Sequence, residues 1–368
     1  MRYNLGYKII VFVVLVLAPF IGLGIAYAQL QPFTFAERES MALKKDVFQE
    51  EAGIISSQLF ELQDSVLAVQ ATAETTYKLA TLIRKNADDE LRAYQQQHEY
   101  LEGLLVESLE QRKASGDVLD TVLANLLGDP VGQTFGQNAT IKVYSLEEAG
   151  YRGYMAKVRL HNPRAVRMVL AGDRVENCKG ETTSAAARRT GAILAVNAGG
   201  FYAHEGSLIP IGITVIDGEI LTFATYDKDL SFIGFNRNGQ LVGGRIETKE
   251  QLQALDVMHG ASFLPTLLKD GKKQPIPAEW ANTRHPRTLI GHFENDDLLF
   301  IVIDGRRQGW SIGVTLEEAQ DKLLEFKVRD AYNLDGGGSS TFYYNGKVLN
   351  RPSDGKERLV TTNIVVLP

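Results

Sequence analysis

The sequence contains a single cysteine, Cys178, among its 368 residues. An intramolecular disulfide is therefore impossible, and zinc sites built from four cysteines, or from two cysteines and two histidines, are excluded as well. Positive charge is not in excess either, because the net charge is −6 and the sequence pI is about 5.7. A general nucleic-acid binder needs a basic surface that displaces counterions, so this composition argues against that class.

Long apolar runs are scarce as well, and the only one of note covers residues 9–28. It follows Arg2 and Lys8 and has about the length that crosses ~30 Å of hydrocarbon as a helix. We expect residues 1–30 to be a transmembrane anchor of the cell membrane, with the rest of the chain exported. The alternative is a signal peptide cleaved after Ala28, which would leave the chain secreted.

Proline is absent from residues 36–113, which are rich in Glu, Gln, Lys, Ala and Leu. Apolar or small residues recur there in alternating steps of four and three, the spacing of a coiled-coil seam. The seam residues are Ile55, Leu59, Leu62, Val66, Val69, Ala73, Thr76, Ala80, Ile83 and Ala87.

A second step of four from Ala87 to Leu91 interrupts this repeat, as a stutter does. Two architectures are open for residues 36–113: one long helix that forms a homodimer through a coiled coil, or a helical hairpin. His98 lies on the seam, and we assign it to packing rather than to a metal site. Residues 114–137 are expected to be a linker.

The character of the chain changes near Ile141, where glycine becomes frequent and short apolar runs alternate with turn residues. We expect residues 138–368 to form a mixed α+β domain. Thr182 or Thr183 is expected to cap a short helix that ends at Gly191. A capping box that begins at Thr315 is expected to open another.

Three apolar runs in this domain end in a polar residue that is followed directly, or after one residue, by glycine: Asn197, Asp304 and Asp335. Runs without polar interruption are typical of strands buried on both faces, and small-molecule sites are commonly built where such strands end. The third run continues into Gly336, Gly337, Gly338, Ser339, Ser340 and Thr341. This glycine loop favours an anion site, and the missing Gly-Lys-Ser/Thr excludes a Walker A loop.

Arginines accompany these segments, and arginine forms paired hydrogen bonds with phosphate and carboxylate groups. They are Arg284, Arg287, Arg306, Arg307, Arg351 and Arg358. Arg287 is notable because it stands between Pro286 and an apolar run, whereas Arg306, Arg307 and Arg351 have the pattern of solvated surface residues.

Five motifs appear in order: VNAGGFY (196–202), RHPRTLIG (284–291), DGRRQGWSIGVTLEEA (304–319), NLDGGGSST (333–341) and PSDGKER (352–358). Together they resemble the phosphodiester glycosidase family, over roughly residues 141–368. One departure is the pair Gly199-Gly200, where the family more often has a single glycine before two aromatic residues. It leaves the geometry of that loop open.

The resemblance implies a hydrolase that cleaves a sugar C1–O–phosphate bond, such as that of an N-acetylglucosamine-1-phosphodiester. It implies phosphate binding by Arg287, Arg306 and the backbone of Gly336–Ser339. Asp304 and Asp335 are then the candidate nucleophile, base or stabiliser of an oxocarbenium-like sugar. Further candidates that would orient the sugar or the carboxylates are Asn197, Ser340 and Thr341, followed by Thr183, Ser184 and His259.

No cofactor is expected, and a Ca²⁺ or Mg²⁺ ion held by the two carboxylates is the alternative. The expected substrate is an envelope or exopolysaccharide glycan, reached by a domain tethered to the membrane. The competing functional hypothesis is a non-catalytic module that binds a glycan or phosphoglycan from the same membrane stalk. A third hypothesis makes residues 36–113 the active part, as an envelope scaffold.

Overall fold

The computed structural model describes residue 18 and residues 45–225 and 230–368. The predicted anchor at residues 1–30 therefore lies, apart from that one residue, outside the described part of the chain. Within the described ranges, no helix combines the length and the apolar composition needed to cross a membrane.

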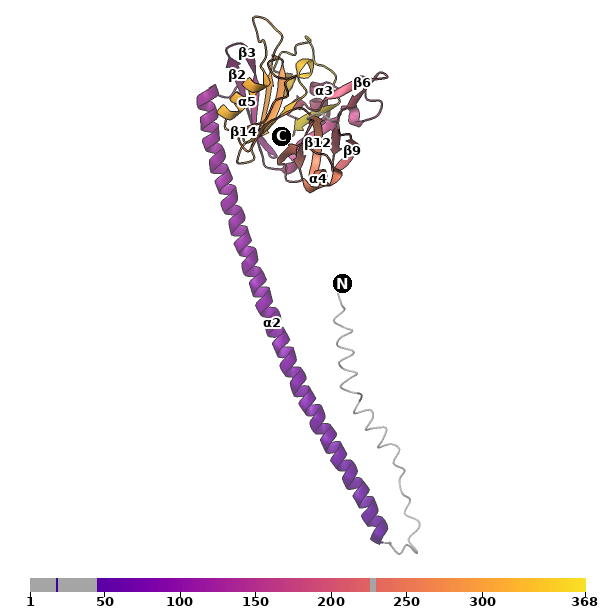
Figure 1. Cartoon of the computed structure of the whole chain (residues 1–368). Coiled ribbons are helices and arrows are strands. Elements are labelled where there is room, and N and C mark those ends of the chain that lie inside the picture. The colour runs from indigo at the N-terminus through magenta and orange to yellow at the C-terminus, as the bar shows by residue number, and fades with distance from the viewer. Residues whose placement is uncertain (1–17, 19–44, 226–229) are drawn as a thin grey trace. The chain divides into compact units, whose positions relative to one another are not determined.

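The first large element is helix α2 (Lys45–Leu127), which is continuous over 83 residues and is drawn as one rod in Figure 1. The chain divides into two compact units, Met1–Tyr100 and Leu101–Pro368, so the first holds most of this helix. Residues 36–44 lie outside the described residues, and from residue 45 to residue 113 the continuity of α2 excludes the helical hairpin. The Asn86–Asp89 segment, which could have begun a new helix, is instead helical throughout.

The linker predicted over residues 114–137 is wrong for most of its length, because α2 runs on to Leu127. Leu119, Leu123 and Leu127 recur every four residues and pack on a core cluster of the second unit. Residues spaced this way share one helix face, so the sequence that appeared to be a connection is an apolar helix end. Gly128 ends the helix with a φ of +78°.

The second unit contains three sheets and a hairpin, and every strand pair in them is antiparallel. The largest sheet has the order β1-β2-β3-β16-β15-β17-β13-β14. Its strands are β1 (Gly132–Phe135), β2 (Ala139–Glu148), β3 (Tyr151–Leu160), β13 (Thr266–Lys269), β14 (Lys272–Lys273), β15 (Arg287–His292), β16 (Leu298–Ile303) and β17 (Asp330–Leu334).

Two five-stranded sheets complete the domain, in the orders β19-β18-β5-β20-β4 and β11-β10-β12-β8-β9. The strands of the first are β4 (Val166–Leu170), β5 (Leu194–Asn197), β18 (Phe342–Tyr344), β19 (Lys347–Val348) and β20 (Thr362–Val366). Those of the second are β8 (Ile213–Ile216), β9 (Glu219–Phe223), β10 (Ser231–Asn236), β11 (Leu241–Gly244) and β12 (Val257–Phe263). The hairpin pairs β6 (Phe201–His204) with β7 (Ser207–Pro210).

The helices that follow α2 in this unit are short, and two of them begin where the sequence predicts. Thr182 caps α3 (Thr183–Thr190), which Gly191 closes in the left-handed conformation. Thr315 forms the expected capping box of α5 (Leu316–Glu325), and Thr248 forms a second one at α4 (Lys249–Ala254). Short 3₁₀ turns cover η1 (Pro163–Ala165), η2 (Ala171–Asp173) and η3 (Gly337–Ser339). The expected α+β class is confirmed.

The eight-stranded sheet is buried on both faces, as β16 shows residue by residue. Leu298, Phe300 and Val302 pack into the cluster shared with the five-stranded sheets. Leu299, Ile301 and Ile303 enter the cluster that contains α5 and the end of α2. Successive side chains of a strand point to opposite faces, so an unbroken apolar run is needed here.

A buried lysine joins the end of α2 to this sheet. Lys157 of β3 is 4% exposed, and its ammonium lies 2.6 Å from Asp120 and 2.8 Å from Asp297. It also donates to the carbonyl of Gly116 at 3.1 Å. Burial works to raise the pKa of Asp120, but hydrogen bonds from Lys142 and Lys157 outweigh it and leave the pKa below its usual value.

We predict that Asp120→Asn lowers the free energy of unfolding by about 1–3 kcal/mol at pH 7, because Lys157 loses a charged partner. The native pKa of Asp120 is depressed. Its contribution is therefore present above the unfolded pKa and lost as the pH falls through the native pKa. Urea unfolding should show the gap between variant and wild type closing below about pH 4.

The matched control is Asp117→Asn, one turn earlier on α2, where the carboxylate is 63% exposed and 3.6 Å from Arg159. An exposed pair of this kind contributes little, so this variant should remain within about 0.5 kcal/mol of wild type. Equal effects of the two substitutions would contradict the assignment of a buried clasp.

Candidate active site

The site is organised by one buried side chain, Asn197, at the end of β5. Its Oδ1 accepts from the Thr288 hydroxyl at 2.8 Å and from the Thr341 amide at 3.1 Å. Its Nδ2 donates to the carbonyl of Asp335 at 2.5 Å. The side chain is fully buried. Asn197 thus holds both ends of the glycine loop (residues 335–341) against β15. These three hydrogen bonds give its side chain a structural role.

Each glycine of the loop has either a close neighbour or a left-handed backbone conformation. A Cβ on Gly336 would lie 2.9 Å from the carbonyl oxygen of Pro286. Gly337 has a φ of +60° and faces the Arg306 guanidinium, and a Cβ on Gly338 would lie 2.1 Å from that of Arg358. The run of three glycines therefore allows two arginines to approach the backbone closely.

The predicted backbone cradle for phosphate is only partly available in this loop. The amide of Gly337 donates to the Pro286 carbonyl at 2.9 Å, and that of Ser339 donates to the Gly336 carbonyl at 3.1 Å. One bond to Pro286 and one bond within the turn thus occupy two of the four amides that we expected to face an anion. The arginines above the loop offer a stronger electrostatic contribution.

Asp335 is the partly exposed carboxylate of this loop. Burial raises the pKa of Asp335 to about 6, although the Ser339 hydrogen bond and the charge of Arg358 act in the opposite direction. A carboxylate with this pKa is mostly ionised at pH 7 but is far more basic than an ordinary aspartate. Such a shift in a partly exposed carboxylate is typical of a functional group.

Asp304, the second candidate carboxylate, is 1% exposed and saturated with donors. It accepts from the Trp310 indole at 2.9 Å, from the Asn350 amide at 3.0 Å and from the backbone N–H of Arg351 at 3.0 Å. Asn350 also donates to the carbonyl of Ser340. Asp304 therefore lies behind the glycine loop and supports it through Asn350.

Two guanidinium groups flank the loop, and each has a partner that orients it. Arg306 lies 3.1 Å from Nδ1 of His285. Burial, with the nearby charges of Arg287 and Arg306, lowers the pKa of His285, so this ring is neutral at pH 7 and can accept a hydrogen bond. Arg358 forms an ion pair with Asp354 at 2.7 Å and lies 3.5 Å from the hydroxyl of Ser339.

Arg287 is not placed at the loop, although its backbone runs beside it. The guanidinium is 2% exposed and donates to the carbonyls of Thr283 at 3.0 Å and Val314 at 3.4 Å. Side chains alternate along β15, so Thr288 reaches Asn197 while Arg287 points to the other face. Burial lowers the pKa of Arg287 to about 10.

The hydroxyl residues after the glycines are buried, and they differ in whether the hydroxyl has a hydrogen-bond partner. Thr341 donates from its hydroxyl to the carbonyl of Ser339 at 3.1 Å. Ser340 is 1% exposed, and its Oγ has no hydrogen-bond partner within the described ranges. The loop thus keeps one buried hydroxyl whose hydrogen-bonding capacity is unused.

The three weaker candidates lie outside the loop. The hydroxyl of Thr183 donates to Asn363 at 2.7 Å. The hydroxyl and amide of Ser184 bind Glu357 at 2.5 and 2.8 Å, which fixes the segment that carries Arg358. His259 lies on β12 and is in contact with Asp217. Burial lowers the pKa of His259.

The doubled glycine at 199–200 has a packing explanation. A Cβ on Gly199 would lie 2.6 Å from the Cβ of Ala261, and one on Gly200 would lie 2.6 Å from Ile211 and from Phe263. Gly199 also donates its amide to the hydroxyl of Thr362 at 2.9 Å. Neither position has room for a side chain. The close packing of this segment against β12 therefore explains the second glycine.

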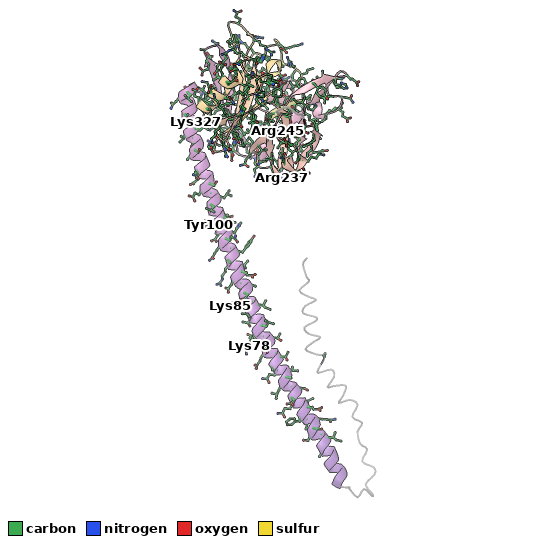
Figure 2. The ribbon with its side chains drawn as sticks, viewed as in Figure 1. Lys78, Lys85, Tyr100, Arg237, Arg245 and Lys327 are labelled. Carbon is green, nitrogen blue, oxygen red and sulfur yellow. The ribbon has the colours of Figure 1, made fainter. Side chains whose placement is uncertain are left out.

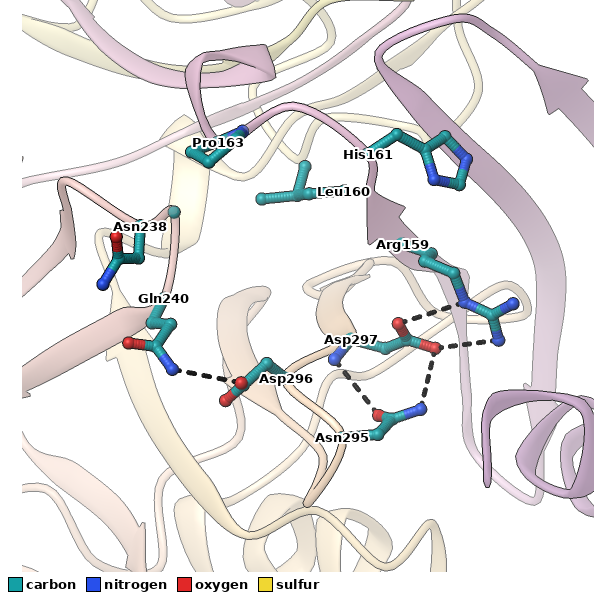
Figure 3. A pocket seen from close by; sticks show the side chains of 10 residues that line it. Arg159, Leu160, His161, Pro163, Asn238, Gln240, Asn295, Asp296 and Asp297 are labelled. Atoms are coloured by element: carbon teal, nitrogen blue, oxygen red, sulfur yellow. Dashed lines mark hydrogen bonds and ion pairs between the residues drawn. The ribbon is translucent and has the colours of Figure 1, made fainter. Parts of the chain in front are cut away.

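A cavity of about 450 Å³ lies elsewhere, at the start of β16 (Figure 3). Arg159, His161, Gln240, Asp296 and Asp297 contribute to its lining. Asp297 precedes β16 and Asp304 follows it, so this six-residue strand separates the cavity from the glycine loop. Among the described residues, no group of three His, Cys, Asp or Glu side chains lies together where it could hold a metal ion.

Sequence reasoning missed three residues that shape the site. Trp310 and Asn350 bind Asp304, and Glu357 ties the last motif to α3. Trp310 and Glu357 lie within the quoted motifs, so their position in the sequence could have indicated a role at the site. Asn350 lies between motifs, and its link to Asp304 spans 46 residues that no local pattern connects.

Residues 190–367 match the phosphodiester glycosidase family. A prophage-derived uncharacterised protein, YomE, of Bacillus subtilis is 30% identical over 193 residues, which cover 50% of this chain and 29% of that protein. The N-acetylglucosamine-1-phosphodiester alpha-N-acetylglucosaminidase of Bos taurus is 29% identical over 192 residues, covering 47% and 35%. The chain therefore spans only about a third of the length of these relatives.

Among solved structures, the zebrafish N-acetylglucosamine-1-phosphodiester alpha-N-acetylglucosaminidase catalytic domain, auto-inhibited by its pro-peptide, aligns with a TM-score of 0.53. The alignment has 22% identity and covers 62% of this chain and 83% of that one. At this identity the likeness shows the fold alone. It supports the β-rich α+β architecture of the second unit.

We predict that Asn197→Ala lowers the free energy of unfolding by about 2–4 kcal/mol, because the buried Thr341 amide and the Asp335 carbonyl lose their partner. Thermal or urea unfolding measures this loss. The control is Asn238→Ala, since Asn238 is exposed on the turn after β10. That variant should stay within about 0.5 kcal/mol of wild type, and a similarly mild effect at Asn197 would contradict its central role.

Proposed function

Because residues 190–367 match the phosphodiester glycosidase family, we propose that this chain hydrolyses the C1–O bond of a sugar-1-phosphodiester. The family assignment of this domain agrees with the resemblance seen in the sequence. The relatives are distant, so the activity itself rests on the site.

The observation that carries the proposal is the pairing of opposite charges at the glycine loop. Asp335 provides a carboxylate whose pKa is raised to about 6, and Arg306 and Arg358 bring two guanidinium groups against Gly337 and Gly338. Cleavage of a glycosyl phosphate needs both: cations that bind the phosphodiester and an anion that meets the sugar as it becomes positive.

The chemistry assigned to each group follows from its surroundings. Phosphate is a good leaving group, so the bond can break with little proton donation. Arg306 and Arg358 bind the phosphate oxygens and stabilise the charge that develops on them. Ionised Asp335 acts on C1, as the nucleophile, as the base for water or as the counter-charge of the oxocarbenium-like sugar.

Asp304 receives a supporting role in this proposal. Its carboxylate is occupied by Trp310, Asn350 and Arg351, so it holds the loop in place rather than contacting the sugar. Arg287 likewise supports the strand beneath the loop through the carbonyls of Thr283 and Val314. We therefore assign Asp304 and Arg287 a structural role in place of the catalytic role expected from the sequence.

We also propose where this enzyme acts and on which class of substrate. The apolar run at residues 9–28, with its basic flank, supports a membrane-tethered enzyme whose domain faces away from the cytoplasm. In that setting the substrate would be a phosphodiester-linked glycan of the envelope or an exopolysaccharide. Substrates of N-acetylglucosamine-1-phosphodiester type are the first to test, because relatives named for that activity match this domain.

We predict that Asp335→Asn lowers kcat about 10³-fold on an N-acetylglucosamine-1-phosphodiester, because the carboxylate is the reacting anion. For wild type, kcat/KM should fall tenfold per pH unit below about 6, where Asp335 becomes protonated. Ionising this carboxylate costs native stability above pH 6, so the variant should melt no lower than wild type at pH 8.

Asp304→Asn separates the two carboxylates. It removes the acceptor of several buried donors, so we expect a loss of about 2–4 kcal/mol in unfolding free energy. Full stability with lost turnover in Asp304→Asn, and normal turnover in Asp335→Asn, would reverse the assignment. Substrate binding without any turnover by wild type would instead support the glycan-binding module.

We also predict that Arg306→Gln and Arg358→Gln each raise KM about 10–100-fold, since a charged hydrogen bond to phosphate contributes ~1.5–3 kcal/mol. Steady-state kinetics on the same substrate measure this. Arg237→Gln is the control, because Arg237 is an exposed arginine of the same unit (Figure 2). Unchanged KM in both loop variants would remove the phosphate assignment.

A further inference from the structure

The first unit presents a long apolar seam to solvent. Along residues 55–87 of α2, large apolar seam residues are more than half exposed, including Leu62 at 64% and Ile83 at 60%. Figure 2 shows the side chains of this helix standing clear along its length. Steps of four and three average 3.5 residues, whereas a helix turns every 3.6, so this seam matches a partner that supercoils with it.

Charge is distributed around this helix in a way that favours a helical partner. We label the seam positions a and d, with Leu59 at a and Leu62 at d. Residues 55–87 contain six charged side chains, and five of these occupy positions b, c and f, away from the seam: Glu61, Asp64, Glu74, Lys78 and Lys85. Only Arg84 flanks the seam, at position e.

The flanking positions e and g select partners in coiled coils through their charges. Here these positions are almost entirely neutral, with Gln58, Gln63 and Gln70 among them. A second copy of the same helix would therefore meet this face without repulsion between like charges. A partner of different sequence would find no charge pattern that selects it.

The interruption at residues 87–91 identifies the partner more closely. The extra step of four between Ala87 and Leu91 unwinds a supercoil locally, and the repeat then continues through Tyr94 and His98. An uninterrupted heptad partner would lose register on one side of this point. A second copy, parallel and in register, places an identical interruption opposite it.

We propose that residues 55–98 form a parallel, in-register coiled coil with a second copy of this chain. Each seam residue then packs against its own counterpart, which removes the exposed apolar stripe from water. This inference rests on α2 alone and is independent of the proposed catalytic activity, so either can fail without the other.

Disulfide trapping in the full-length chain tests this pairing. Leu62→Cys and Ile83→Cys place cysteines at d, where counterparts in a parallel pair lie within disulfide reach. The controls are Leu67→Cys and Leu82→Cys, which change equally exposed leucines, at 55% and 54%, on positions b and c of the same helix. Native Cys178 is buried, which gives a low background.

Under mild oxidation, we expect most of each seam variant to run as a covalent dimer on a non-reducing gel, at least fivefold more than the controls. An antiparallel pair, a staggered pair or a different partner would not bring residue 62 to residue 62. Equal trapping in seam and control variants, or none in either, would overturn the proposal.

Light scattering provides a readout that needs no cysteine. The double variant Leu62→Lys/Ile83→Lys should halve the molar mass of the chain relative to Leu67→Lys/Leu82→Lys, with equal helix content by circular dichroism. A mass that is the same for both double variants, and equal to that of one chain in wild type, would also overturn the proposal.

Discussion

The candidate site depends on the buried amide of Asn197. This side chain accepts from β15 and from the chain after the glycines, and it donates to the carbonyl before them. An amide can do both at once, whereas a carboxylate of the same shape could only accept. Three strand ends from distant parts of the sequence are thereby held together, and the loop between them presents Asp335.

Two glycines of that loop, Gly337 and Gly338, face arginines that approach the backbone. Guanidinium groups of Arg306 and Arg358 occupy the space that side chains at 337 and 338 would need. Positive charge close to the backbone and a carboxylate of raised pKa then belong to the same few residues. Burial that makes Asp335 more basic also costs stability when it ionises, a common compromise at functional sites.

Local patterns in the sequence were sufficient for much of this structure. The apolar runs that end at Asn197, Asp304 and Asp335 are buried strands, and Thr182 and Thr315 cap the helices expected of them. These features depend on periodicity and capping, which neighbouring residues determine. The continuous helix was one of two options, because a stutter and a helix end look alike in one dimension.

Roles that depend on tertiary contacts could not be deduced in the same way. Strand alternation turns Arg287 away from the loop, and that direction follows from a register the sequence does not state. Asp304 and Asp335 end similar apolar runs in the sequence, and only the fold brings Asn350, 46 residues later, to the carboxylate of Asp304. The prediction of a linker at residues 114–137 was wrong for the same reason, because the burial of Leu123 depends on a core that forms only in the folded domain.

We propose that this site cleaves the sugar C1–O bond and not the P–O bond. The most direct measurement is hydrolysis of an N-acetylglucosamine-1-phosphodiester in ¹⁸O-labelled water, with mass analysis of both products. We expect the label to enter the released sugar and to be absent from the phosphate. Label in the phosphate product would contradict it, because Asp335 and the two arginines would then serve a phosphodiesterase.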